Sequence, residues 1–109
     1  MLRTAAQRKE ICKTCPVAKT ADLLGDSFCI LIVRDLLVKP RRFGELETSL
    51  AGVSTRTLSN KLKMLEEEKL ILRRELKTHP PRIEYSLTRK GEAFHGVLDA
   101  MRAYGKKYL

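Results

Sequence analysis

The sequence has no hydrophobic run long enough to span a bilayer. Its longest apolar run, Phe28–Val33, is followed directly by Arg34 and Asp35, whereas a transmembrane helix needs about 20 apolar residues. The basic segment Met1–Lys13 is not followed by the apolar stretch of a secretory signal. We therefore expect a cytoplasmic protein with no membrane partner.

The sequence also lacks the residue patterns of common enzyme sites. It has no paired carboxylates, no glycine-rich phosphate loop and no Cys/His/Asp arrangement. A tetrahedral zinc site needs four ligands, and only Cys29, His79 and His95 remain to complete one with the pair Cys12 and Cys15. We expect no enzyme activity, no metal and no cofactor.

Cysteine is scarce. The three cysteines are an odd number and no secretory signal accompanies them, which argues against a disulfide framework. Cys12 and Cys15 form a C-x-x-C pair, but no strand-and-helix context of the thioredoxin type surrounds it. A redox protein built on this pair is a remote alternative.

Positive charge, in contrast, is abundant. The 109 residues include 22 Lys and Arg against 13 Asp and Glu, which gives a formal net charge of +9. So strong a bias in a short chain favours anionic partners, either nucleic acid or, less often, a membrane surface. The hydrophobic fraction of 43% is that of a globular protein, and the length fits one domain.

Hydrophobic spacing predicts a mainly helical α+β protein. Ile83, Tyr85 and Leu87 alternate with polar residues, as in a half-buried strand, and the preceding Pro80 and Pro81 favour a hairpin tip. In order, we expect helices over 17–24, 26–38, 43–50 and 54–69, strands over 70–77 and 82–87, and a final helix over 89–108. This order predicts a single winged helix-turn-helix domain over 15–109, with a β-hairpin wing and a C-terminal dimerisation helix, after a flexible basic arm over 1–14.

The helices over 43–50 and 54–69 form the candidate DNA-binding unit. A short turn containing Gly52 joins them, as in a helix-turn-helix, and Ser54 is a suitable N-cap. Leu58, Leu62 and Leu65 share one face of the second helix, so polar residues occupy the other. Arg can read guanine and Asn adenine in the major groove of double-stranded DNA. The predicted DNA-binding residues of this helix are Ser54, Thr55, Arg56, Ser59, Asn60 and Lys63. The competing interpretation is an ordinary solvated helix face.

The hairpin is the second candidate contact. Lys77, His79 and Arg82 flank its tip, and Arg42 precedes the first helix of the pair. Such residues contact the DNA backbone or probe the minor groove, which positions a protein more than it specifies sequence. The alternative is a solvated turn. The acidic run 66–68 argues against DNA contact at the far end of the recognition helix.

Several stretches together resemble a known family. They are Cys15-Pro16-Val17, Leu23-Leu24-Gly25, Arg42-Phe43-Gly44-Glu45-Leu46, Val53-Ser54 with Leu58, Leu62 and Leu65-Glu66, Leu70-Ile71 with Arg73, and Pro81–Thr88 followed by Gly91. Over roughly residues 15–104 the chain resembles the HxlR-type winged helix-turn-helix transcriptional regulators, relatives of the MarR group. The resemblance implies a prokaryotic regulator, without enzymatic activity, that dimerises through its terminal helices and binds an inverted-repeat operator. One departure is Asp26-Ser27-Phe28, where the family usually has a basic residue and a Trp.

The last predicted helix carries an apolar stripe. Phe94, Leu98, Met101, Gly105 and Tyr108 recur at helical spacing, and a long exposed apolar stripe is a candidate interface. We expect these residues to form the homodimer interface. The alternative is that the helix folds back onto its own domain.

Cys15 is the candidate redox sensor. It matches a family position that some members use to sense oxidants, and a helix N-terminus with Lys13 and Lys19 nearby would make its thiol reactive. The plainer interpretation is a small residue packed at the dimer interface, and Cys29 is expected in the core. A redox or small-molecule effector fits the family, and a winged-helix module for RNA or protein contact remains the alternative function.

Overall fold

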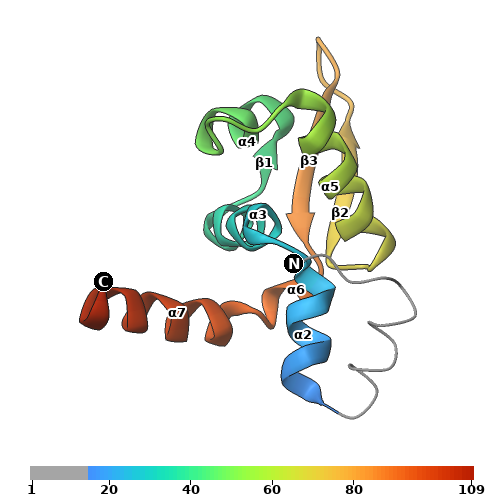
Figure 1. Ribbon diagram of the computed structural model, residues 1–109. Coiled ribbons are helices and arrows are strands. Elements are labelled where there is room, and N and C mark those ends of the chain that lie inside the picture. The colour runs from blue at the N-terminus through green and yellow to red at the C-terminus, as the bar shows by residue number, and fades with distance from the viewer. Residues whose placement is uncertain (1–14) are drawn as a thin grey trace.

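The computed structural model describes residues 15–109. The predicted arm over 1–14, which includes Cys12, lies outside the described residues. In order, the elements are α2 (Pro16–Leu24), α3 (Ser27–Val38), β1 (Arg41–Arg42), α4 (Phe43–Ser49), α5 (Thr55–Glu67), β2 (Ile71–Leu76), β3 (Arg82–Leu87), α6 (Arg89–Glu92) and α7 (His95–Tyr108). The expected mainly helical fold with a small antiparallel sheet is confirmed (Figure 1).

Side chains at the start of α2 and α3 fix where these helices begin. The sulfur of Cys15 caps α2, and Pro16 occupies the first helical turn, where the missing N–H costs nothing. Gly25 ends α2 with a φ of 76°, a conformation that glycine adopts without steric cost. The carboxylate of Asp26 then caps α3 by accepting a hydrogen bond from the backbone N–H of Cys29 at 3.0 Å.

Helix α3 lies at the centre of the core, as its nearly continuous apolar surface predicts. Leu58, Leu62 and Leu65 of α5 are buried against the core, so the predicted inner face of that helix is confirmed. None of the helices within residues 15–109 is long and apolar enough to cross a membrane.

The sheet has three antiparallel strands in the order β1-β3-β2. The predicted hairpin is confirmed, with Ile71 opposite Leu87 at its base. Strand β1, which pairs Arg41 with Tyr85, is a strand that the sequence pattern did not predict. Two residues are too few to show alternation, and their pairing depends on a strand more than forty residues away.

The prediction of one continuous helix over 89–108 is wrong. Helix α6 ends at Glu92 and α7 begins at His95. Between them the backbone N–H of Phe94 bonds the carbonyl of Gly91, three residues earlier, at 3.1 Å. The apolar spacing continues through this break because Phe94 and Leu98 both turn into the same core, where they are 7% and 6% exposed. Beyond them α7 leads away from the other elements, on the side opposite to the wing tip (Figure 1).

The base of the hairpin is joined to α6 by a compact contact around Thr88. The hydroxyl of Thr88 donates to the carbonyl of Lys69 at 2.6 Å and accepts from the N–H of Gly91 at 3.1 Å. The N–H of Thr88 donates to the carbonyl of Leu70 at 3.0 Å. The wing and the start of the C-terminal helices are therefore held in one fixed relation.

Candidate nucleic-acid interface

Helices α4 and α5 form the predicted helix-turn-helix. Leu46 and Leu50 anchor the first helix in the core. The chain then turns at Gly52, whose φ is 96°, and the N–H of Val53 bonds the carbonyl of Leu50 at 3.0 Å. The hydroxyl of Ser54 accepts the backbone N–H of Thr57 at 3.0 Å, which confirms the predicted N-cap. Helix α5 ends at Glu67, two residues before the predicted end.

The outer face of α5 presents free polar groups. Arg56, Ser59, Asn60 and Lys63 are all exposed. Within residues 15–109 their side chains have no hydrogen bond or ion pair. An arginine and an asparagine one turn apart, with no internal partner, are free to bond the edges of bases.

The two residues at the start of α5 are occupied within the protein. Ser54 donates to the hydroxyl of Thr57 at 2.9 Å in addition to capping the helix. Thr55 donates its hydroxyl to the carboxylate of Glu47 in α4 at 2.8 Å. The bond between Thr55 and Glu47 joins the two helices, and the bonds of Ser54 cap α5. Both side chains therefore have a structural role, whereas the structure gives no separate indication that they read bases. No pattern in the sequence predicted that Glu47 would make this contact.

Arg42 and Arg82, which are forty residues apart, lie along the same groove. The groove has a volume of about 890 Å³ and lies between α4 and the hairpin tip, where Phe43, Thr48 and Pro81 also line it. The start of α4 is ordered by Glu45, whose carboxylate accepts the backbone N–H of Arg42 at 2.9 Å. This hydrogen bond lowers the pKa of Glu45.

Lys77 and His79 are exposed near the hairpin tip, between strands β2 and β3. Together with Arg42 and Arg82 they extend the basic surface along the wing. The structure therefore places the three predicted hairpin residues at exposed positions, and it places Arg42, also exposed, at the start of α4.

An ion pair attaches α5 to the centre of the domain. Lys61 binds the carboxylate of Asp26, the residue that caps α3. Burial by itself would raise the pKa of Asp26, but the hydrogen bonds from Lys61 and from the N–H of Cys29 outweigh it, so the pKa is lowered. Asp26, at which this chain departs from the usual family pattern, thus links the start of α3 to α5.

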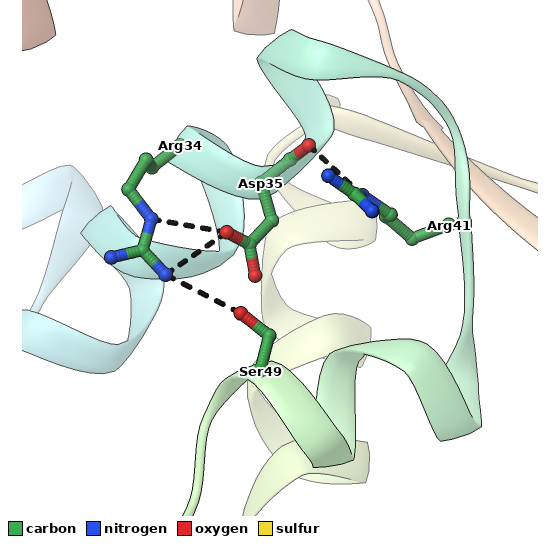
Figure 2. Close-up of polar contacts among 4 residues, drawn as sticks. All are labelled: Arg34, Asp35, Arg41 and Ser49. Atoms are coloured by element: carbon green, nitrogen blue, oxygen red, sulfur yellow. Dashed lines mark hydrogen bonds and ion pairs between the residues drawn. The ribbon is translucent and has the colours of Figure 1, made fainter.

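A second polar cluster joins α3 to α4 and β1. Arg34 donates to one carboxylate oxygen of Asp35 and to the hydroxyl of Ser49 in α4, at 3.0 and 3.4 Å. Arg41 of β1 donates to the backbone carbonyl of Asp35 at 3.3 Å (Figure 2). The other carboxylate oxygen, Oδ2 of Asp35, is buried without a hydrogen-bond partner in the described residues. Nothing in the hydrophobic pattern predicted a buried carboxylate in this helix.

Comparison with known proteins decides the family. The family model for the HxlR-like helix-turn-helix matches residues 23–109.

The chain belongs to the HxlR-like family.

Several relatives of this HxlR-like protein are transcriptional regulators by name. It is 41% identical to the HTH-type transcriptional regulator sll1512 of Synechocystis, over 87% of this chain and 70% of that one. It is 38% identical to YvaP of Bacillus subtilis, over 87% and 89% of the two chains. It is 33% identical to YodB of the same organism, over 86% and 85%.

Solved structures agree with this assignment. A MarR-family transcriptional regulator of Porphyromonas gingivalis superposes with a TM-score of 0.82 at 32% identity, covering 89% of this chain and 95% of that one. The reduced form of YodB gives 0.75 at 32%, with 87% and 94% covered. The oxidised form of the redox regulator HypR gives 0.81 at 26%, with 87% and 98% covered. The HxlR-like protein is a transcriptional regulator with a winged helix-turn-helix fold.

Two cysteines of the HxlR-like protein lie in opposite environments. Cys15 is exposed at the start of α2, where its sulfur accepts the N–H of Ala18 at 3.4 Å. Cys29 is buried in α3, and burial together with the nearby Asp26 carboxylate raises its pKa to about 12. Within residues 15–109 no group of three or more His, Cys, Asp or Glu is placed to hold a metal.

The predicted interface residues of α7 divide into two groups. Phe94 and Leu98 are already buried in the core of their own domain, as the fold-back alternative expected for part of the helix. Met101 and Tyr108 are exposed, and Gly105 is half-buried. The exposed large hydrophobic residues of this helix are Val97, Met101, Tyr104 and Tyr108.

Proposed function

We propose that two copies of this chain bind an inverted-repeat operator in double-stranded DNA. Helix α5 enters the major groove through its N-terminal half, and the wing lies on the backbone or in the minor groove. The observation that carries the proposal is the free outer face of α5. Within residues 15–109, Arg56 and Asn60 are exposed there and their side chains have no partner, on a helix whose other face is buried.

Each part of the surface has a distinct task in this proposal. Arg56 and Asn60 read base edges, because their side chains can each form two hydrogen bonds with one base. Lys63 neutralises a phosphate. Arg42 and Arg82, which share a groove beside the wing, hold the DNA backbone and set the orientation of the protein.

We expect the second copy of the chain to pack against the first along α7. Val97, Met101, Tyr104 and Tyr108 leave an apolar stripe in solvent on a helix that leads away from the core. Pairing two such helices about a two-fold axis removes this stripe from water. The two recognition helices would then lie about one DNA turn, roughly 34 Å, apart.

Selection of bound sequences from a random DNA pool tests the proposal. We expect enrichment of an inverted repeat whose half-sites are about 10 base pairs apart. Binding that depends on salt but enriches no sequence would contradict a sequence-specific regulator. Enrichment of RNA over DNA would favour the RNA-binding alternative.

We further propose that Cys15 makes operator binding sensitive to oxidants. Cys15 is exposed, while Cys29 is buried with a raised pKa and therefore stays protonated. Structures similar to this chain include diamide-treated YodB and both redox forms of HypR. In the reaction with diamide, Cys15 joins a second thiol in a disulfide, and the diazene takes up the two electrons and two protons that the thiols release.

A further inference from the structure

A second basic surface lies at the end of the hairpin opposite to the wing tip. It is a groove of about 590 Å³ between the end of α5, the start of β2 and the start of α6. We call it the hairpin-base groove. The residues that line it include Glu66, Lys69, Leu72, Arg73, Arg89 and Lys90.

The hairpin-base groove holds four cations and one carboxylate. Lys90 donates to the backbone carbonyl of Glu68 at 2.9 Å, so its position is fixed. The side chains of Lys69, Arg73 and Arg89 are exposed and have no hydrogen bond or ion pair with any residue of the described chain. Four cations against the single carboxylate of Glu66 give the described lining of the groove a net positive charge, which favours an anionic ligand.

The same groove offers apolar and backbone contacts. Leu72 is 52% exposed, although leucine is usually buried. It lies on β2, which is an edge strand in the order β1-β3-β2. An edge strand presents backbone N–H and C=O groups that another chain can pair with. An extended peptide can therefore add to β2 and place an apolar side chain against Leu72.

The groove is separate from the proposed DNA surface. Along α5, Glu66 is about 15 Å from Arg56, at 1.5 Å per residue. Along β2, Leu72 is about 20 Å from the wing tip, at 3.3 Å per residue. The groove and the proposed DNA surface therefore lie at opposite ends of α5 and of the hairpin.

We propose that the hairpin-base groove binds an extended acidic segment of another protein, with alternate apolar residues packing on Leu72 and acidic residues facing Lys69, Arg73 and Arg89. The floor of the groove is preformed, because Thr88 bonds the carbonyls of both Lys69 and Leu70. The chain's own first fourteen residues do not fit this site, since they include four basic residues and one acidic residue. The regulator would thus hold a protein partner on one side while it binds DNA on another.

Fluorescence anisotropy with a labelled ten-residue peptide that alternates glutamate and valine tests the proposal. We expect saturable binding to the full chain, weakened about tenfold by Arg73→Glu combined with Arg89→Glu. Leu72→Ser should also weaken it. A peptide with lysine in place of glutamate should not bind, and one with serine in place of valine should bind less tightly.

The matched control is Lys19→Glu combined with Lys106→Glu, which changes the net charge equally at exposed positions on α2 and α7. Its peptide affinity should stay within about twofold of the wild type, because distant exposed charges are screened. No binding of the peptide, or an equal loss in both double variants, would overturn the proposal. So would a large loss of DNA affinity confined to the Arg73/Arg89 variant, because the groove would then be a DNA contact.

Discussion

Gly91 packs so closely against Leu70 that a Cβ on the glycine would overlap the carbonyl oxygen of Leu70. This contact holds the base of the wing against α6, and only a residue without a side chain fits there. Thr88, which bonds both the carbonyl of Leu70 and the N–H of Gly91, keeps the two segments in place.

Gly91→Ala should therefore destabilise the protein by about 2 kcal/mol, since the backbone of Leu70 must move to make room. Urea denaturation followed by circular dichroism measures this. The matched control is Gly96→Ala in α7, where a Cβ meets no atom within 4 Å and where alanine favours the helix. Equal free energies of unfolding for the two variants would show that the close contact is absent.

Arg56→Ala should relax sequence preference at one base pair, at a cost of about 1–3 kcal/mol in discrimination. Asn60→Ala should do the same at a different position. Anisotropy titrations with the selected operator and its single-base variants measure the effect. Glu67→Ala, at the far end of the same helix, serves as the control. A uniform loss across all sequences would show that neither residue reads a base.

Lys63→Ala should weaken binding to all sequences alike. If Lys63 neutralises one phosphate, the slope of log affinity against log salt falls by about one. Titrations at several salt concentrations give this slope. An unchanged slope would remove Lys63 from the DNA surface.

Met101→Glu should shift the protein from dimer to monomer, because it places a charge in the exposed apolar stripe of α7. Sedimentation equilibrium gives the dissociation constant. Ala103→Glu, an exposed position on the opposite face of the helix, is the control. If both variants remain dimeric, the interface lies elsewhere.

The ion pair between Asp26 and Lys61 should contribute about 0.5 kcal/mol, because both side chains are partly exposed. Asp26→Asn keeps a good helix cap, so a double-mutant cycle with Lys61→Gln isolates the pair. The folded-state pKa of Asp26 is below its ordinary value of 3.8. The contribution is therefore complete above that pH and is lost as the pH falls below it through the folded pKa. A coupling energy that persists at the lowest pH would contradict this account.

Diamide should lower the operator affinity of the wild type, and Cys15→Ser should abolish the response. Cys29→Ala should retain it, because the buried Cys29 thiol, with a pKa of about 12, remains protonated at neutral pH. Anisotropy before and after treatment measures both. An unchanged response in Cys15→Ser would exclude Cys15 as the sensor.

Much of this fold was predictable because local patterns agree with the final packing. Ile83, Tyr85 and Leu87 alternate because one side of β3 faces the core, and Ser54 precedes α5 because its hydroxyl caps that helix. The outer face of α5 followed directly from the spacing of its leucines. Patterns of this kind depend only on neighbours in sequence.

Contacts between distant segments were not predictable. Strand β1 exists because Arg41 meets Tyr85, and the link from Thr55 to Glu47 depends on how two helices cross. The break before α7 could not be predicted from the hydrophobic pattern, because Phe94 continues the apolar spacing although the chain bends there. The burial of the Asp35 carboxylate was not predictable, because a charged residue in an otherwise apolar helix is expected to face solvent.

If the proposed dimer forms through α7, the short break at Ala93 and Phe94 affects the spacing of the two DNA half-sites that the dimer can bind. It is the point where α7 leaves the body of the protein, and Phe94 is locked in the core. In a pair joined through α7, the angle at this bend sets how far apart the two recognition helices stand. The tolerance of such a dimer for operators of different spacing would then be determined by the stiffness of two residues that lie outside the proposed DNA surface.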